Sequence, residues 1–249
     1  MSTQRPYVLS IAGFDPSGGA GILADVKTFE ANKVYGMSVM TGNTFQNESE
    51  FESVDWIPRE KIIKQLEILN KKYKFEFAKV GLVESLETLS TLVSHLKSHI
   101  SSLIWDPILE ASAGFEFHKT IEKEKLKSIL QHIYLLTPNT EEAIALTGIN
   151  DPMKAAEELS KHCNVYLKGG HNEKNKGKDF LYTTEGKQFS FNPKLKNTFS
   201  KHGSGCVLSS AIAANLANGY KLNKACLRGK QYTERFLTSN KSLLGNHKL

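Results

Sequence analysis

A cysteine follows a Gly-Ser-Gly turn in the stretch KHGSGCVLSS, where an apparent helix begins. The unpaired backbone N–H groups of Gly203, Ser204 and Gly205 would gather at the positive end of the helix dipole, which favours an anion such as a phosphate. The same position is expected to lower the pKa of the Cys206 thiol, which could then act as a base or hold a reactive oxygen. A buried packing cysteine is the alternative, and these residues alone support it at least as well.

Polar side chains also stand where other apparent strands end. Asp106 closes an apolar strand, and it could either enter a magnesium shell or cap a helix. Asn139 and Glu142 share one helix face and either point back at the strand edge or form a capping box. Lys168 precedes two glycines, which would let backbone and ammonium approach phosphates together, although a solvent-facing lysine before a turn is common.

The stretch GFDPSGGAGILAD joins an apparent strand to an apparent helix. Its glycines match a weak form of the dinucleotide fingerprint, but no acidic residue ends the next strand to hold a ribose, which argues against an NAD site. The glycines could simply allow close packing of the helix on the strand. The preferred interpretation is a loop that folds over a small substrate, with Asp25 as an acceptor for exocyclic N–H groups.

Apolar strand-like runs alternate with helical patterns along the chain. The predicted strands cover residues 7–11, 35–47, 51–56, 75–80, 101–105, 133–136 and 164–170. A hairpin follows at 179–191 and turns at Glu185-Gly186, and two helices end the chain. This order predicts one α/β domain over residues 1–249, a doubly wound and mostly parallel sheet with helices on both faces and a small edge hairpin. Ligands in such sheets gather at the carboxyl ends of the strands.

The composition excludes several classes of protein. A formal net charge of +6, with 40% hydrophobic and 23% charged residues, is ordinary for a globular protein and does not indicate a nucleic-acid partner. Cys163, Cys206 and Cys226 are widely spaced, which suggests neither a disulfide framework nor a zinc site. The sequence shows no signal-peptide pattern and no apolar stretch of membrane-spanning length. We therefore expect a soluble cytoplasmic protein without a membrane partner.

Taken together, these loops resemble those of the ribokinase-like superfamily, and more narrowly the hydroxymethylpyrimidine/phosphomethylpyrimidine kinases of thiamine biosynthesis. The resemblance runs in order through SIAGFDPSGGAGILAD, TGNTFQN, KVGL, DPI, TPNTEEA, LKGGH and HGSGC. It covers nearly the whole chain, and its first and last motifs are the most specific. Most members of the superfamily carry an aspartate as catalytic base after the Gly-x-Gly turn. The pyrimidine-kinase branch and one branch of pyridoxal kinases carry a cysteine there instead, as this sequence does at Cys206.

The resemblance implies an ATP-dependent kinase that phosphorylates the hydroxymethylpyrimidine, its monophosphate or both. Cys206 would accept or orient the proton of the attacking oxygen, and residues 203–206 would form the anion hole. Asp106 and Glu142 would help to organise Mg²⁺. Asn139 and Lys168 would lie beside the ATP phosphates. The pyrimidine pocket would be formed by Gly13, Asp25, Gln46, Leu82 and Ile108.

One departure from the family pattern lies next to the anion hole. Ser200 and Lys201 stand where the family usually has Asn-Thr. The added cation could tighten nucleotide binding or simply face water.

Two other functions stay open at this point. A pyridoxal or pyridoxine kinase would use a similar cysteine and a similar flat substrate, although Asp25 and Gln46 favour the aminopyrimidine. A non-catalytic sensor on the same fold would be expected to have lost the catalytic residues. The resemblance also suggests a homodimer.

Overall fold

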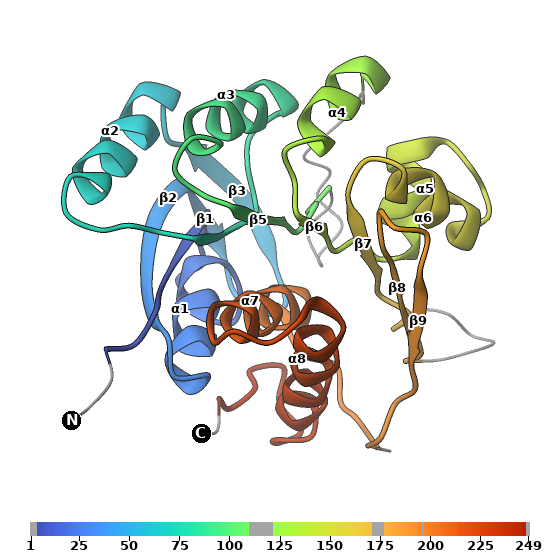
Figure 1. Ribbon diagram of the computed structural model, residues 1–249. Coiled ribbons are helices and arrows are strands. Elements are labelled where there is room, and N and C mark those ends of the chain that lie inside the picture. Colours follow the sequence, from blue (N-terminus) through green and yellow to red (C-terminus); the bar gives the residue numbers. More distant parts are fainter. Residues whose placement is uncertain (1–3, 110–121, 171–176, 196, 248–249) are drawn as a thin grey trace.

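The computed structural model describes residues 4–109, 122–170, 177–195 and 197–247, and its strands form one sheet (Figure 1). The strands follow the spatial order β3-β2-β1-β4-β5-β6-β7-β8-β9. Their bounds are β1 (Tyr7–Phe14), β2 (Tyr35–Gln46), β3 (Phe51–Trp56), β4 (Phe77–Val80), β5 (Ser102–Trp105), β6 (Leu135–Leu136), β7 (Asn164–Leu167), β8 (Asp179–Tyr182) and β9 (Gln188–Phe191).

The centre of the sheet is parallel and its two edges are antiparallel. Strands β2, β1, β4, β5, β6 and β7 pair in parallel, whereas β3 at one edge and the β8–β9 hairpin at the other pair antiparallel. Gly186 turns the hairpin with a φ of 76°. The predicted doubly wound sheet with an edge hairpin is confirmed. Because parallel strands end at the same edge, the loops after them meet there.

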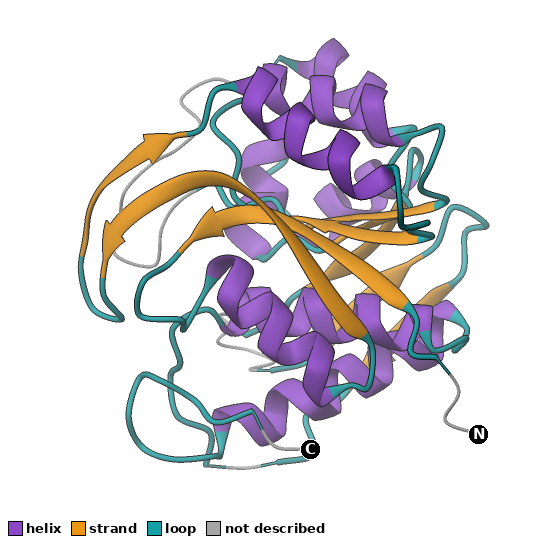
Figure 2. Ribbon diagram, turned by 90° about the vertical axis from the view of Figure 1, so that its left-hand side faces the viewer, coloured by secondary structure: helices purple, strands orange, loops and turns teal. Residues whose placement is uncertain are grey.

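Helices cover both faces of the sheet (Figure 2). One face carries α1 (Gly21–Ala31), α7 (Ser204–Ala217) and α8 (Leu222–Leu237). The other face carries α2 (Arg59–Asn70), α3 (Leu86–Leu96), α4 (Lys123–Leu130), α5 (Thr140–Thr147) and α6 (Pro152–Ser160). None of the helices within the described residues is long and apolar enough to cross a membrane.

The alternation of side chains along β1 and β4 decides what faces α7. In β1, Leu9 and Ile11 belong to the core under α2 to α6, so the fully buried Ser10 between them points to the opposite face. In β4, Lys79 lies between Ala78 and Val80 in the same way, and it is also fully buried. Two polar groups are thereby directed to the layer between the sheet and helices α1 and α7.

Capping residues fix the helices that follow the strands on the site edge. Asn139 begins α5 with a complete capping box, and Gly148 ends it in the left-handed conformation with a φ of 75°. Asp151 caps α6 ahead of Pro152. Asparagine and aspartate at a helix start, proline after the cap and glycine at a helix end are the residue types that favour such termini.

Candidate functional site

The N-terminus of α7 forms the centre of the site. Gly203 has a φ of 69° and caps the helix without a side-chain hydrogen bond, so no capping side chain occupies the first amide groups. A Cβ on Gly205 would lie 3.4 Å from Nζ of Lys168 and 3.9 Å from Oδ2 of Asp106. The turn therefore lies beside the ends of β5 and β7.

Lys168 lies between two carboxylates. Its Nζ is 2.9 Å from Oδ1 of Asp106 and 3.4 Å from Oε2 of Glu142. Asn139 belongs to the same group. The backbone N–H of Glu142 donates to Oδ1 of Asn139 at 2.7 Å, and the backbone N–H of Asn139 donates to Oε2 of Glu142 at 2.7 Å. The capping-box interpretation of this pair is correct, and it brings Glu142 to the lysine.

Asp106 is almost completely buried and fully bonded. It accepts from Thr137 Oγ1 at 2.9 Å, from Lys168 Nζ at 2.9 Å and from Ser209 Oγ at 3.1 Å. These partners are side chains of other elements and not the amides of a following helix, so the helix-cap alternative does not describe it. Burial raises the pKa of Asp106, but the Lys168 and Lys79 ammoniums outweigh it and hold that pKa below its usual range. Burial raises the pKa of Glu142.

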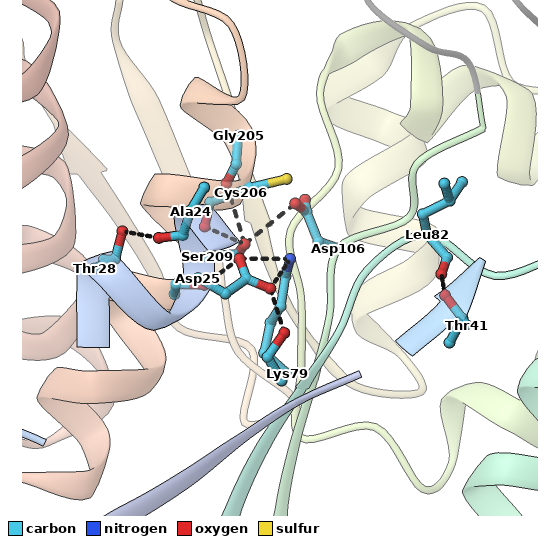
Figure 3. A network of polar contacts seen from close by, with 12 residues as sticks. Ala24, Asp25, Thr28, Thr41, Lys79, Leu82, Asp106, Gly205, Cys206 and Ser209 are labelled. Carbon is cyan, nitrogen blue, oxygen red and sulfur yellow. Dashed lines mark hydrogen bonds and ion pairs between the residues drawn. The ribbon is translucent and has the colours of Figure 1, made fainter. Parts of the chain in front are cut away.

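Cys206 is buried, with 6% of its surface exposed, and lies among charged groups (Figure 3). The backbone N–H of Gly21 donates to its sulfur, and Lys79, Asp25 and Asp106 are close enough to act on the thiol electrostatically. Burial, aided by the two carboxylates, raises the pKa of Cys206 to about 11, although Lys79 and the Gly21 amide lower it. The predicted depression of this pKa is wrong, because the helix terminus is buried against carboxylates.

Asp25 lies beneath the cysteine and is completely buried. Its two oxygens accept from Lys79 Nζ at 2.9 and 3.0 Å, from Ser10 Oγ at 2.6 Å and from Ser210 Oγ at 2.7 Å. This arrangement leaves no exposed oxygen for exocyclic N–H groups of a substrate. The prediction of direct substrate contact is therefore corrected, since a carboxylate with four internal hydrogen bonds supports the site from below.

Three of the predicted substrate-binding residues, Gly13, Gln46 and Leu82, lie at or just after the ends of β1, β2 and β4. A Cβ on Gly13 would approach Cδ2 of Leu82 to 3.0 Å. Gln46 is half-buried and donates to Thr44 Oγ1 at 2.8 Å, and Thr44 in turn donates to the carbonyl oxygen of Phe14 at 2.8 Å. Ile108 follows Asp106 and is also half-buried.

Sequence reasoning missed several residues that organise this site. Lys79 is the most central, because its ammonium joins Asp25 and acts on both Cys206 and Asp106. A lysine within an otherwise apolar strand was the signal that could have revealed it. The other missed residues bond to the site carboxylates and have no local sequence signature: Ser10, Thr137, Ser209 and Ser210.

Asp106 and Glu142 are carboxylates of the kind that suit a magnesium ion arriving with a nucleotide. Among the described residues there is no group of three or more His, Cys, Asp or Glu side chains that could hold an ion. Mg²⁺ commonly takes one or two carboxylates together with phosphates and several waters. Asp106 and Glu142 provide that smaller set beside Lys168.

The fold and the site define the class of the protein as a ribokinase-like α/β protein. A phosphomethylpyrimidine kinase from Clostridium difficile superposes with a TM-score of 0.77 and 32% identity, covering 94% of this chain and 98% of that one. The Staphylococcus aureus pyridoxal kinase in complex with AMP-PCP and pyridoxal superposes with a TM-score of 0.84 and 25% identity, covering 97% of this chain and 91% of that one.

The family model of phosphomethylpyrimidine kinase matches residues 15–248, and the chain belongs to this family. A hydroxymethylpyrimidine/phosphomethylpyrimidine kinase of Saccharomyces cerevisiae is 35% identical over 93% of this chain. The alignment covers 45% of that relative, so the chain spans just under half the length of the yeast protein.

Proposed function

We propose that the protein transfers the γ-phosphoryl group of ATP to 4-amino-5-hydroxymethyl-2-methylpyrimidine, to its monophosphate, or to both. The observation that carries the proposal is the meeting of the α7 N-terminus with Lys168 and Asp106, where a Cβ on Gly205 would lie 3.4 Å from Nζ of Lys168 and 3.9 Å from Oδ2 of Asp106. The backbone amides at the α7 N-terminus and the Lys168 ammonium lie close together, which suits phosphoryl transfer. Catalysis of that reaction depends on positioning and charge neutralisation. Family membership supports the same reaction.

The phosphate-binding roles are assigned to the residues around this point. The amides of residues 203–206 receive the γ-phosphoryl oxygens, and Lys168, with Asn139 beside it, lies by the phosphate chain. Asp106 and Glu142 are the residues that would hold Mg²⁺ through its waters. When bound, the ion neutralises charge on the phosphates.

Cys206 is assigned to the hydroxymethyl group of the substrate. The substrate oxygen forms its bond to γ-phosphorus as the bond to the β-phosphate oxygen breaks, ADP leaves, and the hydroxyl proton passes to the cysteine sulfur. Because the resting thiol is protonated at neutral pH, only the small thiolate fraction can accept this proton. Phosphoryl transfer has a loose transition state that needs little base strength, so a weakly populated base is sufficient.

The pyrimidine ring is assigned to the region at the ends of β1, β2 and β4, beside Gly13, Leu82 and Ile108. Gln46 is the direct reader of the amino group, since its amide is half-buried and carries both donor and acceptor atoms. Asp25 acts through Lys79 and the serines that it orders. A homodimer in the cytoplasm is also part of the proposal, as the family resemblance suggests.

A coupled assay of ADP release tests the proposal. The purified protein is given ATP and Mg²⁺ with the pyrimidine alcohol, its monophosphate or pyridoxal, and Cys206→Ala is assayed in parallel. We expect turnover with at least one pyrimidine and a large loss of kcat in the variant, with ADP affinity nearly retained because the backbone amides survive. Tight binding of the pyrimidine without turnover would instead establish a sensor.

Pyridoxal kinase is the second candidate, because the structural match to the Staphylococcus aureus pyridoxal kinase has a high TM-score. Turnover of pyridoxal equal to or better than that of the pyrimidines in the same assay would reverse the ranking. A Gln46→Leu variant separates the two further. It should raise KM for the pyrimidine if the amide reads its amino group.

A further inference from the structure

The glycine-rich loop at residues 15–21 is organised around Asp15, which is 1% exposed. One oxygen of Asp15 accepts from the amide of Ser17 at 2.9 Å, and the other accepts from Ser17 Oγ at 2.9 Å and from the amide of Ala20 at 2.8 Å. The same oxygen lies 3.0 Å from Nε2 of His202, a residue 187 positions away in the chain. The loop is therefore bonded to the residue that precedes the anion hole.

The two segments touch so closely that only glycine fits between them. A Cβ on Gly203 would lie 2.0 Å from the carbonyl oxygen of Gly19, and a Cβ on Gly19 would lie 2.7 Å from Cδ2 of His202. A Cβ on Gly21 would lie 2.2 Å from the carbonyl oxygen of Gly13. The loop therefore packs directly on the turn before α7.

The C-terminal segment supports His202 from behind. The amide of His202 donates to the carbonyl oxygen of Leu243 at 3.0 Å. Nζ of Lys201 donates to the carbonyl oxygen of Asn240 at 2.6 Å, to its side-chain oxygen at 3.0 Å and to the carbonyl oxygen of Ser242. Lys201, expected to bind nucleotide or face water, is instead 5% exposed and anchors this segment.

We propose that the Asp15–His202 contact is a positioning pair for Cys206. The loop that Asp15 organises ends at Gly21, whose N–H is directed at the Cys206 sulfur, and it packs on Gly203, one turn of α7 before Cys206. By joining this loop to the turn before α7, the Asp15–His202 pair holds the Gly21 N–H against the Cys206 sulfur. It also keeps the loop over that sulfur. The pair touches no reacting atom and acts only through the position of the loop.

Alkylation of the three cysteines tests this inference without any substrate. Cys163 and Cys226 are 1% and 0% exposed and lie away from the pair, so they report global unfolding. We expect His202→Leu to raise the rate at which N-ethylmaleimide modifies Cys206 by at least about tenfold, because opening the loop gives the reagent access to a side chain that is only 6% exposed. The rates at Cys163 and Cys226, followed by peptide mass spectrometry, should not change.

Two further variants make the test specific. His202→Gln keeps a donor near the position of Nε2 and should react at nearly the wild-type rate. Ser17→Ala removes another hydrogen bond to the same Asp15 carboxylate and leaves the His202 contact, so it should also behave as wild type. A wild-type rate at Cys206 in His202→Leu, or a parallel rise at all three cysteines, would overturn the inference.

The role in catalysis rests on the proposed function and is measured separately. We expect His202→Leu and Asp15→Asn each to lower kcat about 100-fold with KM for ATP little changed, and the double variant to lose no more than either single one. Additive losses would contradict a shared role. If wild type itself turns over no substrate, the proposed function fails, while the alkylation rates still decide whether the pair positions Cys206.

Discussion

Cys206 is a thiol surrounded by groups that oppose one another. Its burial and the carboxylates of Asp25 and Asp106 favour the protonated form, and Lys79 with the Gly21 amide favours the thiolate. Burial is the largest of these influences, which is why the position at a helix N-terminus does not produce a reactive thiolate. The charge around the sulfur thus depends on three side chains, which come from α1, β4 and the loop after β5.

The raised pKa of Cys206 predicts a pH dependence of catalysis. If the thiolate accepts the proton, its population and kcat/KM should rise about tenfold per pH unit between pH 7 and 9, since the pKa lies at about 11. Initial rates over this range, with enzyme stability checked at each pH, provide the measurement. Cys206→Ser should be slow and lack the rise, and a flat wild-type profile would show that the sulfur orients the hydroxyl without taking its proton.

Lys79 and Asp25 form an ion pair in which both side chains are 0% exposed. Replacing Lys79 with Met leaves the carboxylate buried without its cation, and we expect a loss of about 3–5 kcal/mol in the free energy of unfolding. Arg5→Met is the matched control, because Arg5 and Glu30 form an exposed pair at a similar distance of 2.8 Å. That change should cost less than about 1 kcal/mol in urea denaturation. Similar losses in the two variants would contradict the burial argument.

At the scale of elements, the site depends on a tight junction between the glycine-rich loop and α7. Gly203 and Gly186 both have positive φ values, 69° and 76°, but only Gly203 is crowded. A Cβ at 186 would meet nothing within 4 Å, whereas one at 203 would lie 2.0 Å from the Gly19 carbonyl oxygen. Substitutions at these two glycines therefore distinguish the cost of backbone strain from the cost of a steric clash.

We expect Gly186→Ala to cost only the backbone strain, about 1–2 kcal/mol in the free energy of unfolding, and to leave kcat unchanged. Gly203→Ala should cost more and should lower kcat strongly, because the loop must move away from α7. Denaturation and initial-rate measurements on both variants decide this. A Gly203→Ala enzyme with wild-type kcat would show that the junction is not needed for catalysis.

At the scale of the whole molecule, the C-terminal segment returns to pack on α1 and α8. Nδ1 of His247 lies 3.0 Å from the hydroxyl of Tyr232 and 3.4 Å from Oγ1 of Thr28, and its ring lies 4.9 Å from that of Phe236. Burial lowers the pKa of His247 to about 4. The chain end is thus joined to the first helix and the last helix of the same face.

The lowered pKa of His247 predicts a loss of stability in mild acid. The unfolded chain takes up a proton below about pH 6.5 and the folded chain only near pH 4, so stability should fall as the pH drops between these values. We expect His247→Asn to lose less than wild type over this window, by on the order of 1–3 kcal/mol. Urea denaturation at several pH values measures the free energy of unfolding of both proteins. The other titrating groups are the same in both, so their contributions cancel in the difference. Parallel pH curves for the two proteins would contradict the prediction.

The order of strands and helices followed from the sequence by itself. Period-two and period-3.6 apolar patterns, together with local capping signals such as Asn139 and Asp151-Pro152, depend only on residues close in the chain. These same local patterns predicted that Asp106 and Lys168 stand at strand ends and that a helix begins just before Cys206, and a parallel sheet brings strand ends to one edge.

What surrounds each of these residues was decided only by the tertiary structure. Asp25 meets Lys79 from 54 positions away, and Asp15 meets His202 from 187 positions away. No local pattern encodes such contacts, because they depend on which strand faces pack against α1 and α7. The sign of the Cys206 pKa shift belongs to this second group, since burial and the charges that accompany it exist only after the chain has folded.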